Sequence, residues 1–338
     1  MDITQVLNTL LEKHDLTREE TKFFLTDVMQ GNLLPSQIAA VLVALRMKGE
    51  TVDEIVGFIQ AMRDQMVHVA APDAIDVCGT GGDGSNSINV STAVSFVVTA
   101  CGVNVAKHGN RAASSKSGAA DVLETLGVNI QLTAEQAKHV FDRVGMVFLL
   151  APLFHPATKN VVIVRKELKV RTIFNFLGPF LSPASVSKQL IGVPNKASAE
   201  ILIEVGKQLG YKHLVIVTGE DGMDEVSISA PTFMFDLKNN RVSKTVITPE
   251  KYGFKKATKE SILGGSADEN AEDLRSILQG EKGSKRDIVV LNSAIALYAA
   301  DTVSTIEEGI KRAEKAIDSG AAMQVLEKLI KETRHYAK

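Results

Sequence analysis

The sequence predicts an α/β protein, in which a small N-terminal all-helical domain precedes a large domain with a central, mostly parallel sheet flanked by helices. Residues 1–66 carry apolar residues at helical spacing and contain no convincing strand. From residue 74 onward, strand-like apolar runs alternate with helical patterns, which is typical of parallel sheets covered by helices. A chain of 338 residues also exceeds what one hydrophobic core normally serves, so a small domain beside a large one is expected.

The N-terminal region is predicted to form about four helices, judged from their start signals. Capping boxes at residues 17–20 and 51–54 begin two of them. We expect residues 1–66 to form the small helical domain, joined by helices from about 165–183, and residues 67–338 to form the large domain. A ligand is expected in the cleft between the two domains.

A glycine-rich segment connects the first predicted strand of the large domain to a helix. Residues 75–78 read as a buried strand, and residues 86–92 are expected to form the start of a helix. Between them the chain can turn sharply at Gly79, Gly81, Gly82 and Gly84. Exposed backbone N–H groups beside a helix N-terminus attract phosphate, although a plain strand-to-helix turn has the same pattern.

Asp83 restricts the ligand that this loop would accept. No Gly-Lys-Ser/Thr follows the glycines, so the segment is not a Walker phosphate loop. The Asp83 carboxylate would also repel the pyrophosphate of a dinucleotide. The loop is therefore expected to hold a sugar phosphate, or a diphosphate that is bridged by Mg²⁺.

The rest of the large domain is predicted to alternate strands and helices and to end in helices. Strands are expected at 103–106, 146–150, 190–193 and 214–218, and helices at 118–126, from 133, at 157–168 and at about 198–209. A hairpin is expected at 232–250, around Asn239-Asn240. Capping boxes at 266–269 and 304–307 are predicted to begin two of the later helices.

The overall composition is that of an ordinary globular protein, with 45% hydrophobic and 23% charged residues. A net charge of −2 gives no general attraction to nucleic acid or to an anionic membrane. Cys78 and Cys101, the two cysteines, have neither the spacing nor the setting of a metal site or a disulfide framework. No signal peptide or membrane-spanning apolar run is recognisable, so we expect a cytoplasmic protein that engages no membrane and no nucleic acid.

Three further parts of the sequence carry polar or charged side chains that could bind a ligand, and each also has a purely structural explanation. The dense polar run at residues 107–115 follows a predicted strand, where open α/β sheets bind ligands, but a solvated loop is the plain reading. Asp224 and Glu225 offer hard oxygen ligands for Mg²⁺, although an exposed acidic turn has the same spacing. Arg165 would suit a carboxylate if it faced the cleft, whereas a helical arginine usually faces solvent.

Five segments together resemble the anthranilate phosphoribosyltransferase family. They are residues 76–92, 107–126, 154–157, 171–179 and 223–226, and they occur in the family's order across essentially the whole chain. The resemblance implies a nucleoside phosphorylase/phosphoribosyltransferase-like fold and a homodimer formed through the helical domain. It also implies transfer of the phosphoribosyl group of phosphoribosyl pyrophosphate (PRPP) to the amine of anthranilate, which is the second step of tryptophan biosynthesis from chorismate.

The resemblance further implies roles for individual residues. PRPP would be held by Gly79, Gly82, Asp83, Ser87, Asn89, Val90, Ser91, Thr92, Lys107, His108, Gly109, Asn110, Arg111, Ala112, Ala113, Ser114, Ser115 and Ala119. Anthranilate would be held by Gly79, His108, Asn110, Arg165 and Gly178. Mg²⁺, the expected cofactor, would be bound by Ser91, Asp224 and Glu225. The residues expected to act in catalysis are Lys107, Arg165 and Asp83.

Two residues depart from the family's pattern, and two other functions compete with the one it implies. Ala119 stands where a serine is frequent, which removes a hydroxyl, whereas Ser87 in place of a threonine keeps one. A pyrimidine nucleoside phosphorylase would carry an Arg-Gly and a threonine-rich turn in place of residues 107–111. A DNA-binding member of the fold would need a basic groove, which a net charge of −2 does not favour.

Overall fold

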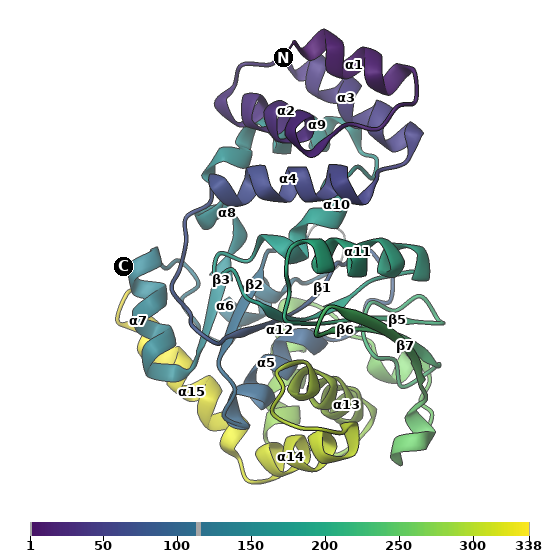
Figure 1. Ribbon diagram of the computed structural model, residues 1–338. Helices are drawn as coiled ribbons and strands as arrows, with labels where there is room; N and C mark the ends of the chain where they lie inside the picture. Colours follow the sequence, from purple (N-terminus) through teal and green to yellow (C-terminus); the bar gives the residue numbers. More distant parts are fainter. Residues whose placement is uncertain (1, 113–115, 338) are drawn as a thin grey trace.

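The computed structural model describes residues 2–112 and 116–337, and it places a helical domain against one side of an α/β domain (Figure 1). Three predicted site residues, Ala113, Ser114 and Ser115, lie outside the described residues. Within the described ranges, no helix is long and apolar enough to cross a membrane.

The helical domain combines the N-terminal helices with a helix from later in the chain. Its helices are α1 (Ile3–Leu11), α2 (Arg18–Gln30), α3 (Pro35–Lys48) and α4 (Val52–Asp64), with α9 (Lys159–Leu168) packed against α2 and α3. The capping boxes predicted at Thr17 and Thr51 are confirmed. Each threonine hydroxyl accepts a hydrogen bond from the backbone N–H of the glutamate three residues later, and that glutamate's carboxylate accepts one from the threonine N–H. Inside the domain, the ring centres of Phe24 and Phe58 lie 5.9 Å apart.

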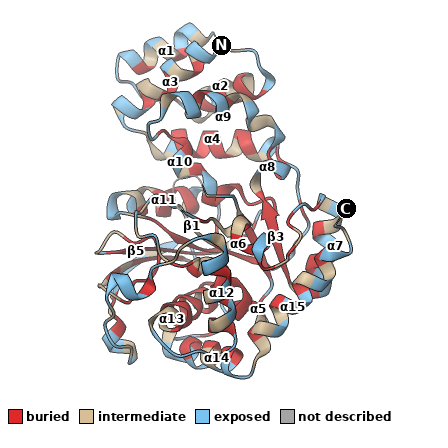
Figure 2. Cartoon of the chain, turned by 180° about the vertical axis from the view of Figure 1, so that it is seen from behind, coloured by how far each residue is buried: buried red, intermediate tan, exposed pale blue. Residues whose placement is uncertain are grey.

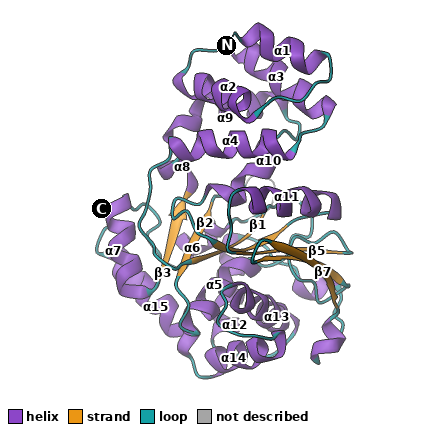
Figure 3. Cartoon of the chain, viewed as in Figure 1, coloured by secondary structure: helices purple, strands orange, loops and turns teal. Residues whose placement is uncertain are grey.

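A seven-stranded sheet in the order β3-β2-β1-β4-β5-β6-β7 forms the centre of the large domain (Figure 3). The strands are β1 (Ile75–Gly79), β2 (Val105–Gly109), β3 (Met146–Leu150), β4 (Lys188–Gly192), β5 (His213–Gly219), β6 (Thr232–Lys238) and β7 (Arg241–Ile247). Strands β1 to β5 pair with one another in parallel, whereas β6 pairs antiparallel with both β5 and β7. The mostly parallel sheet is therefore confirmed. Because the strand order reverses direction at β1, the carboxyl ends of β1 and β4 border the crevice where such sheets bind ligands.

The tight turn between β6 and β7 lies where it was predicted. Asn239 and Asn240 have φ values of 51° and 61°, which a two-residue hairpin turn requires and which asparagine tolerates. The sequence therefore located this hairpin from local turn chemistry alone.

Helix positions in the large domain follow the prediction, with shifts at some starts. The helices are α5 (Val90–Ala100), α6 (Ala119–Thr125), α7 (Ala134–Val144), α8 (Ala151–Phe154), α10 (Phe174–Leu177), α11 (Lys196–Gln208), α12 (Ala267–Leu278), α13 (Ser284–Ala299), α14 (Ile306–Asp318) and α15 (Ala321–Arg334). The short 3₁₀ helices are η1 (Pro156–Thr158), η2 (Gly178–Leu181), η3 (Pro249–Tyr252) and η4 (Lys259–Ile262). α5 begins later than expected because Asn86 has a φ of 49°, outside the right-handed helical region. The capping box predicted at residues 304–307 is wrong, since Thr305 caps α14 instead.

The two faces of the sheet belong to two different hydrophobic cores. Helices α5 and α13 contact one face, while α11 contacts the other face and also α4. Along β5, Val215 and Val217 join the first core, whereas Leu214 and Ile216 join the second, which continues into the helical domain. Figure 2 shows the buried residues concentrated along the strands and on the helix faces turned toward them. The helical domain is therefore attached through continuous apolar packing.

Candidate active site

The glycine-rich loop after β1 is bound to the segment that carries Asp224 and Glu225. The Gly81 N–H donates to Asp224 Oδ2 at 2.6 Å, and the Asp224 N–H donates to Asp83 Oδ2 at 3.3 Å. Gly81 and Gly82 have φ values of 71° and 72°, which glycine adopts without strain. The structure thus brings together two segments that the sequence singled out separately.

Two facing glycines make room for this contact at the carboxyl ends of β1 and β4. Gly79 and Gly192 are register partners across the two strands. A Cβ atom at Gly79 would lie 2.5 Å from Asp224 Oδ2, and one at Gly192 would lie 1.5 Å from the Asp224 carbonyl oxygen. Both positions therefore require glycine. Gly192 was not predicted, and only its place beside Gly79 in the sheet shows why it is needed.

Asn292 of α13 holds the other end of the acidic segment and was also not predicted. Its Oδ1 accepts from the Val226 N–H at 2.9 Å, and its Nδ2 donates to the Val226 carbonyl at 2.9 Å. The side chain is fully buried in a helix whose neighbouring residues, 288–291, are buried and apolar. The sequence signal for Asn292 was a single amide side chain after a run of apolar helix residues. Such an amide is expected to be buried and hydrogen-bonded, often to backbone groups.

The acidic segment carries carboxyl groups that are buried close to one another. Burial, followed by the charge of Asp83, raises the pKa of Asp224 to about 7. Burial and the charge of Asp224 also raise the pKa of Glu225. A divalent cation would relieve both the desolvation and the mutual repulsion. Among the described residues, no three histidine, cysteine, aspartate or glutamate side chains form a metal-binding group, so hydroxyl, water or substrate oxygens would have to complete a metal site here.

Lys107 of β2 lies beneath the loop with its ammonium group buried. Its Nζ donates to the Val77 carbonyl at 2.6 Å and to Ser91 Oγ at 3.1 Å. Burial raises the pKa of Asp76 to about 7, and the charge of Lys107 opposes this rise. Lys107 opposes the rise in the pKa of Glu225 in the same way. One buried cation therefore acts on two buried carboxyl groups, Asp76 of β1 and Glu225 of the acidic segment.

The N-terminus of α5 lies directly after the loop and lacks a side-chain cap. Asn89 occupies the N-cap position, but its Nδ2 donates to Ser117 O at 3.3 Å and its Oδ1 accepts from Asn270 at 2.8 Å. No described residue hydrogen-bonds the buried Thr92 hydroxyl. The first N–H groups of α5 are engaged, that of Val90 with Ile88 O at 2.8 Å and that of Ser91 with Glu225. The unpartnered Thr92 hydroxyl at the positive end of the helix suits a phosphate ligand.

Four other predicted residues frame this side. Ser87 lies in the loop before α5, where it pairs with Leu263 through an isolated β-bridge, and Val90 is the buried first residue of α5. Gly109 ends β2 beside Ala119, the first residue of α6. A Cβ atom at Gly109 would lie 2.9 Å from Phe148 Cε2 and 3.7 Å from the Ala119 Cβ, so the Phe148 ring leaves no room for a side chain here.

His108 of β2 is a buried histidine at the carboxyl end of the sheet. Burial, together with the charges of His155 and Lys107, lowers the pKa of His108 to about 3, so its imidazole is neutral at neutral pH. No described residue hydrogen-bonds its Nε2, and its ring centre lies 5.4 Å from that of His155. A hydrogen bond with the Gly178 backbone brings two predicted anthranilate-binding residues together.

Arg111 and Ala112 are held by carboxylates of α6, and Asn110 bonds the Arg111 backbone. The Arg111 guanidinium pairs with Glu124 at 2.5 Å and with Asp121 at 3.1 Å. The Ala112 N–H donates to Asp121 Oδ2 at 3.0 Å, and Asn110 Oδ1 accepts from the Arg111 N–H at 2.8 Å. The charge of Arg111 is therefore directed toward α6, and a phosphate that binds here would compete with those carboxylates.

Arg165 lies on α9, over the aromatic ring of Phe174. The guanidinium carbon is 5.3 Å from the ring centre. Burial lowers the pKa of Arg165, and no carboxylate of the described residues opposes that shift. Nearby in sequence, Arg171 Nη2 donates to the Gly82 carbonyl at 3.3 Å, which ties this segment to the glycine loop. A half-buried cation without an anionic partner is suited to bind a carboxylate ligand.

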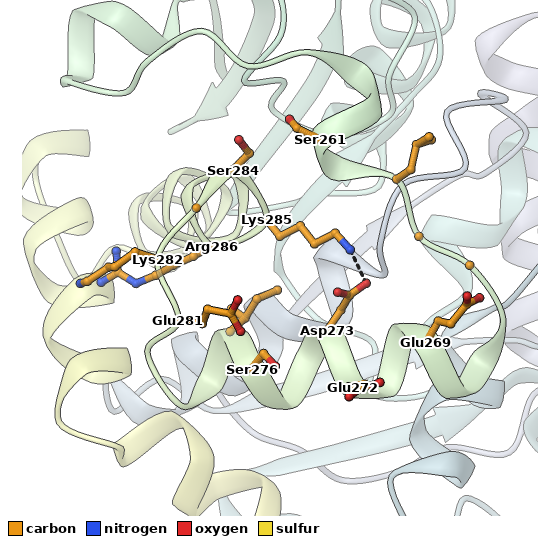
Figure 4. Close-up of a pocket in the computed structure, with 15 residues that line it drawn as sticks. Ser261, Glu269, Glu272, Asp273, Ser276, Glu281, Lys282, Ser284, Lys285 and Arg286 are labelled. Carbon is orange, nitrogen blue, oxygen red and sulfur yellow. Dashed lines mark hydrogen bonds and ion pairs between the residues drawn. The ribbon is translucent and has the colours of Figure 1, made fainter.

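Three cavities of the described structure have no predicted site residue in their lining, although Leu263, the bridge partner of Ser87, lines the first of them. One of about 590 Å³ lies between α12 and the start of α13, where Lys285 pairs with Asp273 at 2.6 Å (Figure 4). Another of about 660 Å³ includes Lys188 and Lys212 near the amino ends of β4 and β5. The third, of about 590 Å³, includes Arg275. None is lined by a predicted site residue, so the polar geometry locates the candidate site.

Two family models match the chain, one for each part of the fold. The model described as "Glycosyl transferase family, helical bundle domain" matches residues 4–66. The model described as "Glycosyl transferase family, a/b domain" matches residues 71–323.

The chain is also similar to curated and solved proteins over nearly its whole length. The anthranilate phosphoribosyltransferase of Nitrobacter hamburgensis is 46% identical, over 97% of this chain and 98% of that protein. That of Clostridium beijerinckii is 48% identical, again over 97% and 98%. A Thermus thermophilus anthranilate phosphoribosyltransferase structure has a TM-score of 0.91 at 36% identity, covering 97% of this chain and 99% of that one. The Saccharomyces cerevisiae structure in complex with PRPP and Mg has a TM-score of 0.90 at 28% identity, covering 98% of each chain.

Proposed function

The chain belongs to the anthranilate phosphoribosyltransferase family, and from that premise we propose how its own residues carry out the family's reaction. The enzyme transfers the phosphoribosyl group of PRPP to the amine of anthranilate, giving N-(5-phosphoribosyl)anthranilate and pyrophosphate, the second step of tryptophan biosynthesis from chorismate. The observation that best supports the residue roles is the glycine loop bonded to Asp224 at the carboxyl ends of β1 and β4.

PRPP binds at the glycine loop and the N-terminus of α5. Backbone N–H groups of the glycine loop and the Thr92 hydroxyl donate to its phosphates, at the positive end of α5. Asp83 accepts from a ribose hydroxyl while its other bonds keep the loop in shape. The predicted residues between Lys107 and Ser115, together with Ala119, complete this half of the site.

Mg²⁺ would be held by Ser91, Asp224 and Glu225. The donor set fits the ion, because it offers hard oxygens from two buried carboxyl groups and leaves room in the coordination shell for water and phosphate oxygens. When bound, the ion supplies charge neutralisation for the leaving pyrophosphate. Lys107, which already bonds Ser91, places a second positive charge near the same point.

Anthranilate binds on the side formed by Arg165, His108 and Gly178, with Asn110 and Gly79 at its edges. The Arg165 guanidinium meets the carboxylate, since no described residue already neutralises it. Neutral His108, with its free Nε2, accepts a hydrogen bond from the amine and so turns the nitrogen lone pair toward the ribose.

The reaction needs orientation and charge stabilisation more than a strong base. An aromatic amine attacks with its lone pair and loses its proton after the new bond has formed. The residues around the site therefore hold the two reactants in line, exclude water and stabilise the departing pyrophosphate. This agrees with the low pKa of His108, which makes it a poor proton acceptor and keeps the ring neutral, so that Nε2 has a lone pair for a hydrogen bond.

The test is the loss of anthranilate fluorescence when PRPP and Mg²⁺ are added. We expect the loss to require both. Unchanged fluorescence together with phosphorolysis of thymidine or uridine would instead favour a nucleoside phosphorylase. Tight, salt-sensitive binding to DNA without transfer would favour the nucleic-acid-binding alternative.

The helical domain is proposed to form a homodimer interface. Large apolar side chains of this domain are exposed, namely Leu11, Leu34, Met47, Val162 and Ile163. The helices that carry or adjoin them, α1, α3 and α9, contact one another as α1 with α3 and α3 with α9. Exposed apolar patches of this kind mark contact surfaces. Light scattering should give twice the chain mass of 36.4 kDa, and a monomer would contradict the proposal.

A further inference from the structure

The short helix η2 is held in place by side chains from distant parts of the chain. The Pro179 carbonyl accepts from Gln189 Nε2 at 2.7 Å, and the Phe180 carbonyl accepts from Arg63 Nε at 2.9 Å. Gln189 belongs to β4 of the sheet, whereas Arg63 belongs to α4 of the helical domain. Two successive carbonyls of η2 are therefore bound from two different domains.

The next carbonyl along η2 has a third external partner. Leu181 O lies 2.9 Å from His155 Nε2, and the His155 ring packs against that of His108. Tertiary contacts, and not the local backbone alone, decide where this segment lies relative to the proposed anthranilate side.

Gln189 connects η2 to the end of β2 and to the helical domain. Its Nε2 also donates to Asp76 Oδ2 at 3.3 Å, and Asp76 Oδ1 accepts from the His108 N–H at 3.1 Å. Its Oε1 accepts from the Tyr211 hydroxyl at 2.9 Å, and Arg63 Nη2 donates to that hydroxyl at 3.4 Å. A chain of hydrogen bonds thus runs from α4 through Tyr211 and Gln189 to the strand that carries His108.

Burying a chain of polar side chains in a protein core costs folding free energy. Gln189 is fully buried and Tyr211 is nearly so. A buried amide or hydroxyl destabilises the protein unless its hydrogen bonds are formed. Apolar residues of similar size would pack the same space without that penalty. The directional bonds therefore point to a role in fixing positions.

We propose that Gln189, Tyr211 and Arg63 are positioning residues that set the anthranilate side of the site. They fix η2 and the carboxyl end of β2 relative to each other and to the helical domain. The inference rests on the proposed function, because anthranilate is the ligand that these two segments would contact.

Two variants test the proposal. Gln189→Met keeps the side-chain length and removes the amide, and Tyr211→Phe removes one hydroxyl. We expect each to raise the KM for anthranilate about tenfold while the KM for PRPP stays within about twofold. The double variant should exceed the stronger single variant by no more than about twofold, because both changes break one chain of bonds.

Tyr298→Phe is the matched control. It removes a tyrosine hydroxyl that donates to Asp236 at 2.7 Å, beside the ring of His213 and outside the proposed site. Both KM values should stay at the wild-type level in this control. Unchanged KM values in Gln189→Met and Tyr211→Phe, or equal rises for both substrates, would overturn the proposal. If Gln189→Met does not fold, Tyr211→Phe carries the test alone.

Hydrogen exchange separates this proposal from the proposed function. Faster amide exchange in the peptide spanning 174–185 in either variant supports a positioning role, and this readout needs no turnover. Unchanged exchange there would overturn the role. If the wild-type protein transfers nothing from PRPP to anthranilate, the proposed function fails, and the exchange measurement still decides whether the network positions η2.

Discussion

The two sides of the candidate site are built in different ways. On the phosphate side, the glycine loop, the Asp224 segment and Asn292 all come from the large domain and bond one another directly. On the anthranilate side, Arg165 lies on a helix packed against the helical domain, and η2 is bonded by Arg63 of α4. The phosphate side is therefore bonded mainly within the large domain, apart from the Arg171 contact with Gly82, whereas the anthranilate side depends on how the two domains sit together.

This difference predicts that each substitution should mainly affect the binding of one of the two substrates. Changes at the loop should impair PRPP and Mg²⁺ handling, while changes near α9 and η2 should impair anthranilate binding.

Gly192→Ala should have the largest effect, because its Cβ would occupy the position of the Asp224 carbonyl oxygen. Displacing the acidic segment by about 1 Å should lower kcat/KM roughly 100-fold. Steady-state kinetics across a Mg²⁺ series measures this. The control is Gly309→Ala, which crowds Ala294 in the α13–α14 contact and should lower the melting temperature without changing kinetics per folded molecule. A Gly192→Ala enzyme with normal kinetics would break the comparison.

Replacing both carboxylates, Asp224→Asn with Glu225→Gln, should lower kcat roughly 50-fold and weaken its dependence on Mg²⁺. The melting temperature should rise, because two crowded, buried acids are removed. Magnesium titration and thermal unfolding on the same sample check both outcomes. An unchanged metal response would exclude these residues from the metal site.

Arg165→Ala should raise the KM for anthranilate about 10- to 30-fold by removing a charge-assisted contact. The KM for PRPP should change little, because the loop is bonded within the large domain. Arg165→Lys is the matched control and should restore part of the affinity, since it keeps the charge but not the planar fork. A rise confined to the KM for PRPP would place Arg165 on the other side of the site.

The two sides should also respond differently to pH. Protons and Mg²⁺ compete for Asp224, whose pKa is about 7, so apparent Mg²⁺ affinity should fall up to about tenfold per pH unit below pH 7 and level off above it. The KM for anthranilate should stay flat between pH 6 and 8, because His108, with a pKa of about 3, is neutral throughout. A bend in the anthranilate KM near pH 6.5 would contradict this.

The raised pKa of Asp224 also predicts how the stability of the protein changes with pH. The folded-state pKa of Asp224 lies above its ordinary 3.8, so without metal its contribution to stability is full below about pH 4 and is lost as pH rises through about 7. Asp224→Asn should flatten this part of the pH–stability curve, as measured by thermal unfolding from pH 5 to 8.

Ala119→Ser should have the smallest effect. It restores a hydroxyl at the start of α6, beside Gly109, and should lower the KM for PRPP about two- to threefold. The KM for anthranilate should not move. A change in the anthranilate value alone would show that α6 serves the other side.

Much of the fold followed from local signals. The capping threonines Thr17 and Thr51 and the Asn239-Asn240 turn were found because their chemistry acts within a few residues. The start of α5 was misplaced because the left-handed φ of Asn86 is set by the loop around it.

Other parts of the site had no local signal. Gly192 reads as an ordinary strand glycine until β4 lies beside β1. Gln189 and Tyr211 are single polar residues in apolar surroundings, and their partners Asp76 and Arg63 lie more than a hundred positions away. No spacing rule connects residues so far apart.

The family, the glycine loop, the paired carboxylates and most helix starts could be recognised in the sequence, because backbone dihedrals and caps depend on near neighbours. The three-dimensional fold was needed to show that Asp224 bonds the loop, that His108 is neutral and that no carboxylate of the described residues pairs with Arg165. Those properties arise from burial and from charges brought close by the fold. Desolvation and Coulomb interactions depend on distance in space, which order along the chain does not specify.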